Sequence, residues 1–153
     1  MTFSTCPYGY HQYRRVCYKV FLSPQTFTYA TTGCQLDGGT LAIPRDAGIN
    51  AFLLNLIAMH AHPPSSFWFG LHDRDYEGQW TWVDGTALGD GYTAWIPGQP
   101  DNSRDRQDCV YYRGDWNYLW DDRECNAAYF FICQVFSSGS PPPTTEIPTT
   151  TRP

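Results

Sequence analysis

The sequence is poor in the features that mark nucleic-acid binders and membrane proteins. Of its 153 residues, 10 are Lys or Arg against 15 Asp or Glu, and a net charge of -5 leaves no basic patch for a phosphate backbone. No apolar run approaches the roughly 20 residues that span a bilayer. These absences argue against a nucleic-acid partner and against a membrane span in this chain.

Strings that signal common catalytic sites are also missing. The chain has no serine nucleophile elbow, no phosphate-binding loop and no zinc-hydrolase string. Asp121 and Asp122 are adjacent, whereas glycoside hydrolysis needs two opposed carboxyl groups. We therefore expect a binding protein and not an enzyme.

The cysteines form an even set without a zinc-type CxxC pair. There are six, at positions 6, 17, 34, 109, 125 and 133, and six cysteines allow fifteen pairings, so their spacing alone does not fix the connectivity. An even, widely spaced set is typical of oxidising compartments. We expect the protein to be secreted or to lie on the extracellular face of a cell.

The first part of the chain predicts a hairpin followed by two helices. Residues 1–22 predict short strands around a turn. Ser23-Pro24 is typical of a helix start, and this helix is predicted to run through Cys34 and to stop at Gly38-Gly39. A second helix is predicted from about Arg45 to His60, because its apolar residues recur at a spacing of three and four.

The later part of the chain predicts strands instead. Short aromatic and β-branched runs at 67–71, 80–83, 109–112 and 130–133 favour an antiparallel sheet, which makes the fold class α+β. The long Gly-, Pro- and Asp-rich segment between Asp84 and Asp108 is of a kind that compact domains keep mainly for function. We expect one domain over residues 1–136 and a Pro/Thr-rich, extended linker or stalk over 137–153.

Oxygen-bearing side chains gather in two strings around this long segment. Gln99-Pro100-Asp101 lies inside it, Gln107 lies at its end, and Trp120-Asp121-Asp122 follows shortly after. Calcium takes six to eight oxygen ligands from carboxylates, amide carbonyls and water. A calcium ion would explain why three carboxylates are brought together.

These strings, in this order, resemble the long-form C-type lectin domain over roughly Cys6 to Cys133. Trp68-Phe69-Gly70-Leu71 is similar to the family's strand signature. Pro97 to Asn102 is similar to its sugar-binding loop motif, and Trp120-Asp121-Asp122 with Cys125 is similar to its second calcium motif. The resemblance implies two helices packed on antiparallel sheets with a long calcium-binding loop.

The resemblance also implies specific disulfides and calcium ligands. The implied disulfides are Cys6–Cys17, Cys34–Cys133 and Cys109–Cys125, and the bond between Gln99 and Pro100 is expected to be cis. The implied primary calcium ligands are Gln99, Asp101, Gln107, Asp121 and Asp122. A second calcium site is expected from Asp73, Glu77, Asn102 and Asp108, although Asp73 and Glu77 could also simply cap a turn.

The sugar preference implied by the resemblance rests on Gln99, Asp101, Gln107 and Asp121. Gln-Pro-Asp in this family accompanies galactose and N-acetylgalactosamine, whereas Glu-Pro-Asn accompanies mannose. Here Gln107 and Asp121 also depart from the family's usual Glu and Asn, so mannose- or fucose-type sugars stay open as an alternative. Asn102 follows the motif where galactose-type members place an aromatic residue. Three other aromatic residues are candidates for the stacking role: Tyr92, Trp95 and Trp116.

The expected partners are therefore glycans, with recognition of microbial surface polysaccharide as one possible role. Monosaccharide binding by one shallow site should be weak, so several copies would be needed for avidity. A calcium-independent domain of the same fold that binds protein stays open as the alternative, because fold does not fix function.

Overall fold

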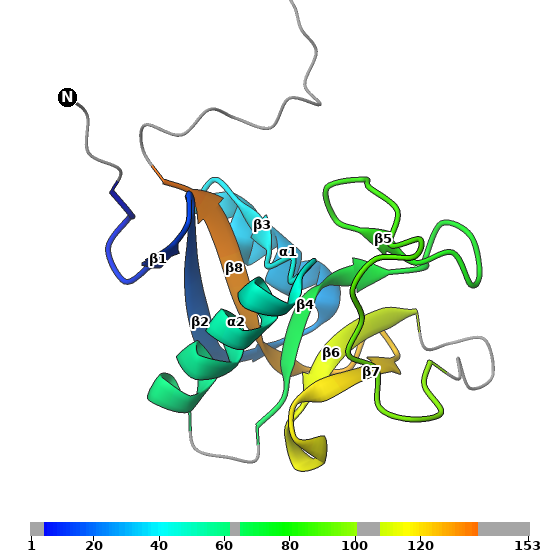
Figure 1. Cartoon of the computed structure of the whole chain (residues 1–153). Helices are drawn as coiled ribbons and strands as arrows, with labels where there is room; N and C mark the ends of the chain where they lie inside the picture. Colours follow the sequence, from blue (N-terminus) through cyan, green and yellow to red (C-terminus); the bar gives the residue numbers. More distant parts are fainter. Residues whose placement is uncertain (1–4, 62–64, 101–107, 138–153) are drawn as a thin grey trace, which may run out of the picture.

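The computed structural model describes residues 5–61, 65–100 and 108–137. Figure 1 shows two helices set against one twisted sheet. The strands are β1 (His11–Tyr13), β2 (Val16–Gln25), β3 (Thr40–Leu41), β4 (Phe67–His72), β5 (Thr81–Trp82), β6 (Cys109–Arg113), β7 (Leu119–Arg123) and β8 (Tyr129–Phe136). The helices are α1 (Phe27–Leu36), α2 (Ala47–His60) and the short 3-10 helix η2 (Gly114–Trp116). The α+β class predicted from the sequence is confirmed.

The sheet has the order β1-β2-β8-β4-β6-β7, with β3 added on β8 and β5 on β4. Most pairs are antiparallel, as predicted, but β4 and β8 run parallel, with Phe67 opposite Phe130. This pair joins the hairpin half of the molecule to the half that carries the long loop (Figure 1). Neither helix in the described residues is long and apolar enough to cross a membrane.

The first helix begins later than the sequence predicts. Ser23 and Pro24 belong to the end of β2, where Gln25 pairs with Tyr129 beyond a register shift. The true N-cap is Thr26, whose hydroxyl accepts a hydrogen bond from the amide of Tyr29 at 3.2 Å. The prediction failed because strand pairing of Gln25 overrides the local Ser-Pro signal. The helix ends before Gly38, which has a φ of 84°, close to the predicted stop.

The second helix matches its prediction within two residues. Asp46 is the N-cap, and its carboxylate accepts a hydrogen bond from the amide of Ile49 at 2.8 Å. The buried face of this helix includes Leu53, Leu56 and Ile57, which pack on one side of the sheet. This packing forms the larger of the two apolar cores.

The two cores lie on opposite sides of the β2–β8 pair, because successive strand residues point to opposite faces. Tyr18, Val20 and Ile132 face α2, whereas Cys17, Phe131 and Cys133 face α1. Trp68 and Trp82 are buried, and Trp80 is half-buried. The large aromatic residues therefore mainly build the cores.

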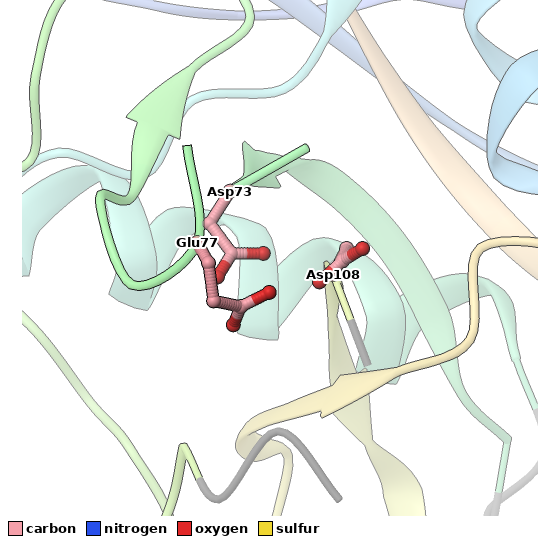
Figure 2. Close-up of side chains that lie close together, drawn as sticks. All are labelled: Asp73, Glu77 and Asp108. Carbon is pink, nitrogen blue, oxygen red and sulfur yellow. The ribbon is translucent and has the colours of Figure 1, made fainter. Parts of the chain in front are cut away.

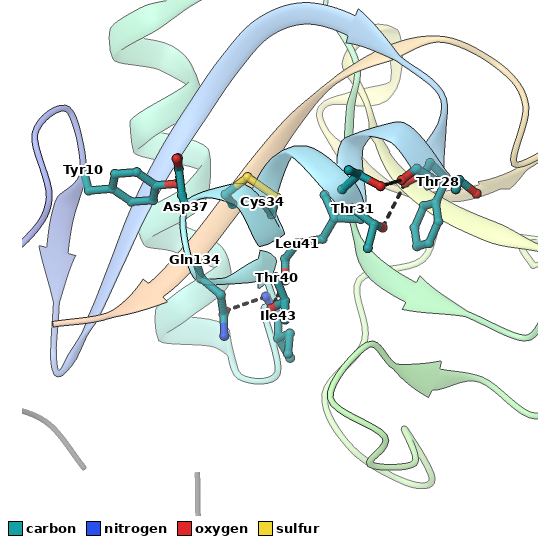
Figure 3. The surroundings of a disulfide bond; sticks show 12 residues. Tyr10, Thr28, Thr31, Cys34, Asp37, Thr40, Leu41, Ile43 and Gln134 are labelled. Carbon is teal, nitrogen blue, oxygen red and sulfur yellow. Dashed lines mark hydrogen bonds between the residues drawn. A yellow bond between two sulfur atoms is a disulfide. The ribbon is translucent and has the colours of Figure 1, made fainter. Parts of the chain in front are cut away.

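Three disulfides fasten the domain, in the pairing that the resemblance implies: Cys6–Cys17, Cys34–Cys133 and Cys109–Cys125. Figure 3 shows Cys34 on α1 with hydrogen-bonded pairs on either side of its disulfide. Tyr10 donates its hydroxyl proton to Asp37 at 2.7 Å, and the amide of Ile43 donates to Gln134 at 2.9 Å. The helix, the N-terminal turn and the last strand are thus tied together.

Hydrogen bonds also hold the residue that directly follows β8 against the fold. Ser137 is buried, and its amide and hydroxyl both donate to the carbonyl of Arg15, at 3.1 and 3.2 Å. Ser137 therefore packs with the folded domain and not with the tail. Residues 138–153, predicted to be a linker, lie outside the described residues.

Candidate functional site

The long loop is fastened along the strand that carries Asp121 and Asp122. The amide of Ile96 donates to the carbonyl of Trp120 at 2.8 Å, and the amide of Trp120 donates to the carbonyl of Ala94 at 2.8 Å. One turn later, the amide of Gln99 donates to the carbonyl of Ile96, also at 2.8 Å. The structure therefore places Gln99 on a loop segment bonded to β7.

The expected cis bond between Gln99 and Pro100 is present. Asp101 and Gln107, which the sequence assigns to the same calcium site, lie outside the described residues, as does Asn102 of the second site. Gln99, Asp121 and Asp122 are the expected primary ligands whose positions the structure describes. They lie on the loop and on the strand to which it is bonded.

Asp121 and Asp122 are both nearly buried, with exposed fractions of 5% and 1%. In the β6–β7 register Asp121 lies opposite Tyr111 and Asp122 opposite Val110, so the two carboxylates leave opposite faces of the strand. The amide of Asp122 donates to Oδ1 of Asp121 at 2.9 Å. Buried carboxylates need compensating charge or hydrogen bonds.

An arginine that sequence reasoning missed supplies that compensation for Asp121. The guanidinium of Arg113 contacts Oδ2 of Asp121 at 3.0 Å and Oδ1 of Asp115 at 2.8 Å. The carboxylate of Asp115 and that of Asp121 both raise the pKa of Arg113. No local sequence pattern indicates the contact between Arg113 and Asp121, because it depends on the pairing of β6 with β7.

The expected second calcium site is better described. Figure 2 shows the carboxyl groups of Asp73, Glu77 and Asp108 turned toward a common space, and they offer oxygens within 4.8 Å of one another. The amide of Asp73 donates to the carbonyl of Asp108 at 2.9 Å, and the amide of Gly78 donates to Oδ2 of Asp73 at 2.8 Å. The backbone thus fixes the loop that follows β4 against the start of β6.

The electrostatics of this cluster suit a cation. Burial, together with the facing carboxyls of Asp108 and Glu77, raises the pKa of Asp73 to about 7, although the hydrogen bond from Gly78 acts in the opposite direction. No donor among the described residues reaches Oδ1 of Asp73 or of Asp108, and a cation placed between these two oxygens would satisfy both. Three carboxyl groups, two of which have an unsatisfied buried oxygen, form a donor set that fits calcium.

The aromatic residues near the loop divide into core and surface. Trp95 packs on Trp80 and Trp120 at centroid distances of 5.3 and 5.6 Å, and Tyr92 also packs on Trp120, at 5.9 Å. Tyr92 and Trp95 therefore fix the loop segment on the core by packing against its tryptophans. Trp116 is 48% exposed and is the remaining candidate for stacking on a sugar.

Comparison with known proteins agrees with this arrangement. The family described as Lectin C-type domain matches residues 23–135. The chain belongs to the C-type lectin domain family. This C-type lectin domain is 35% identical to perlucin of Haliotis laevigata over 130 residues, which cover 84% of the chain and 82% of that protein.

Solved structures confirm the C-type lectin fold. The carbohydrate-recognition domain of mouse scavenger receptor C-type lectin superposes with a TM-score of 0.77 at 26% identity, covering 86% of this C-type lectin domain and 98% of the mouse domain. A calcium-independent type II antifreeze protein superposes with the same TM-score of 0.77 at 23% identity, covering 89% of this chain and 98% of that one. At that identity the second likeness shows the fold alone.

Proposed function

We propose that the chain is a calcium-dependent carbohydrate-binding domain and not an enzyme. The observation that carries this proposal is the backbone bonding of the loop with Gln99 to β7 with Asp121 and Asp122. Backbone hydrogen bonds at Ile96 and Trp120 join the loop segment to β7. The amide side chain of Gln99 and the carboxylates of Asp121 and Asp122 therefore lie on neighbouring backbone segments, although they are far apart in the sequence. The oxygens of this set are of the kind that calcium prefers.

In this proposal the primary ion is held by five side chains: Gln99, Asp101, Gln107, Asp121 and Asp122. Calcium bound there would supply coordination positions for two neighbouring sugar hydroxyls. The amides of Gln99 and Gln107 donate to those hydroxyls, whereas the carboxylates of Asp101 and Asp121 accept from them. Asp73, Glu77, Asp108 and Asn102 would hold a second ion that fixes the loop.

The proposed preference is for galactose or N-acetylgalactosamine, with mannose- or fucose-type sugars second. The proposed preference for galactose rests on Gln99 and Asp101. Mannose- or fucose-type sugars stay second because Gln107 and Asp121 depart from the family's usual Glu and Asn. The proposed setting is the extracellular space, which the three disulfides support. Recognition of microbial polysaccharide by several copies together is the role that we propose.

A glycan array with and without EDTA tests the whole proposal. We expect galactose-terminated glycans to bind in calcium and to be released by EDTA. Asp122→Asn should abolish this binding while the exposed control Asp90→Asn leaves it intact. Mannose binding alone would overturn the galactose preference, and binding that survives EDTA would overturn the calcium dependence.

One observation favours a second candidate, a calcium-independent domain that binds protein. Arg113 already neutralises Asp121 at 3.0 Å, so this carboxylate does not require a metal ion for its compensation. Thermal unfolding with and without calcium separates the two candidates, because an ion that binds only the native state raises the melting temperature. A melting temperature that calcium leaves unchanged would favour the second candidate.

A further inference from the structure

A polar pocket lies directly beside the proposed sugar site and is not used by it. The pocket has a volume of about 350 Å³ and is lined by Ser66, Tyr111, Arg113, Asp115, Arg123 and Tyr129. Tyr111 lies opposite Asp121 in the β6–β7 register, so the two side chains share a face of the sheet. Arg113 contacts Asp121 at 3.0 Å and thereby joins the pocket to the proposed sugar ligand.

The charges of the lining favour an anion. The lining itself contains two guanidinium groups, those of Arg113 and Arg123, and one carboxylate, that of Asp115. Arg113 is engaged by Asp115 and Asp121, but a guanidinium has five N–H groups, and these two contacts do not use them all. Arg123 is exposed and forms no ion pair with a carboxylate of the described residues. Arg123 is therefore the principal cation that the pocket offers to a ligand.

The neutral groups of the lining add hydrogen-bond donors. The rings of Tyr111 and Tyr129 are stacked, with centroids 4.6 Å apart and planes at 10°, which makes a rigid wall. Burial, followed by the proximity of Tyr129 and Asp121, raises the pKa of Tyr111, so its hydroxyl keeps its proton at neutral pH. Ser66 accepts a hydrogen bond from the amide of Gly114 at 3.1 Å, which leaves its own proton available to donate.

A smaller cavity adjoins the pocket. It has a volume of about 240 Å³, and its lining shares Ser66 and Tyr129 with the pocket and adds apolar surface from Pro24 and Phe130. Because they share Ser66 and Tyr129, the two cavities together form a longer groove. A groove of this kind suits an oligosaccharide longer than one unit.

We propose that this pocket is a subsite for a negatively charged substituent, a sulfate or a carboxylate, on the glycan bound at the neighbouring site. The inference rests on the proposed function, because the glycan must first be held next to Asp121. Arg123 would form the charge-assisted hydrogen bonds with the oxyanion, with help from Arg113 and the hydroxyls of Tyr111 and Ser66. The ligand class is thus an acidic glycan.

The test compares matched glycans on the intact chain in calcium. The probes are the neutral oligosaccharide that binds best on the array, the same oligosaccharide sulfated at each hydroxyl in turn, and its uronic-acid analogue. We expect at least one charged form to bind about tenfold more tightly than the neutral form. This advantage should shrink at high salt, because screening weakens partly exposed charge pairs.

Arg123→Gln is the decisive variant, and Arg15→Gln, an exposed arginine in the β1–β2 turn, is its matched control. Arg123→Gln should lose the advantage of the charged form and keep the affinity for the neutral form, whereas Arg15→Gln should keep both. Equal affinity of the wild type for all forms would overturn the subsite alone. Equal weakening of neutral and charged forms by Arg123→Gln would also overturn it. Absence of any calcium-dependent binding of the neutral form would instead overturn the proposed function, and the subsite with it.

Discussion

The backbones of Asp73 and Asp108 are joined by a hydrogen bond of 2.9 Å, and their carboxyl groups face the same space. Like charges are therefore held together by bonds that do not depend on the side chains. A cation placed between the carboxylates would relieve their repulsion. We therefore predict that calcium bound between the two aspartates would stabilise the domain.

Substitution of Asp73 should separate the stability of the calcium-free protein from that of the calcium-loaded protein. Asp73→Asn keeps an acceptor for the amide of Gly78 and removes one of the crowded charges. In EDTA at neutral pH we expect the variant to be more stable than wild type by about 1 kcal/mol, a few degrees in melting temperature. It should also lose most of the rise that calcium produces. The exposed neighbour Asp75→Asn serves as the control, and a variant that is less stable in EDTA would contradict the repulsion.

Removal of Arg113 should strengthen the response to calcium. Arg113→Gln leaves the nearly buried carboxylate of Asp121 without its counter-charge, so the calcium-free protein should lose about 1–3 kcal/mol. Calcium affinity, measured by titration calorimetry, should rise because a nearby positive charge is gone. An unchanged or lower affinity would show that Arg113 does not compete with calcium for Asp121.

Asn50 connects α2 to the two strands that carry the site. Its Oδ1 accepts a hydrogen bond from the Tyr112 hydroxyl at 2.6 Å and another from the indole N–H of Trp120 at 3.2 Å. Asn50→Ala leaves both buried donors unsatisfied, and we expect a loss of about 2–4 kcal/mol in urea unfolding. Tyr112→Phe removes one of these bonds and should cost about 1 kcal/mol. Equal costs for the two variants would mean that the Trp120 bond contributes nothing.

Acid should weaken the cap of α2. The bond from the amide of Ile49, and then the pairing with Arg14, lower the pKa of Asp46 below its usual 3.8. A lowered pKa means that this stabilisation is present above pH 3.8 and is lost as the pH falls through the lower, folded value. At neutral pH Asp46→Ala should cost about 1 kcal/mol, because the cap is lost.

Comparison with Asp46→Asn separates the cap from the charge. Asparagine is also a good N-cap, so this variant should lose only a few tenths of a kcal/mol at neutral pH. The difference between Asp46→Ala and wild type, followed by urea unfolding, should shrink below pH 3.8. A difference that is constant down to strongly acid pH would show that the ionised form has no advantage.

The sugar preference should follow the order of amide and carboxylate in the loop motif. The double variant Gln99→Glu with Asp101→Asn exchanges donor and acceptor at these two positions. We expect the ratio of galactose to mannose affinity to fall by at least about tenfold in competition assays. The melting temperature in calcium serves as the control for an intact site. An unchanged ratio would assign the preference to Gln107 and Asp121.

The sequence predicts the elements whose side-chain patterns reflect burial. The apolar stripe and the Asp46 cap make α2 predictable within two residues. The start of α1 was wrong because the signal of Ser23-Pro24 is local, whereas the pairing of Gln25 with Tyr129 is long-range. The parallel contact of β4 with β8 has no local signal at all.

The candidate site was predictable from the sequence where residues that can bind calcium occur in the order of the family's motifs. The cluster of Asp73, Glu77 and Asp108 was found in this way, although its calcium remains a prediction. Arg113 was missed because its role follows from the register of β6 against β7. The disulfide pairing came from the family resemblance, since spacing alone left fifteen possibilities.

The bonds that attach the long loop to β7 run from main chain to main chain, at Ala94, Ile96 and Trp120. Their strength does not depend on which side chains the loop displays beyond Gln99. The residues that we propose to choose the ligand can therefore change without loss of these bonds. This separation makes residues 97–107 a natural unit for exchange between related domains, and one scaffold can in this way acquire new ligand selectivities.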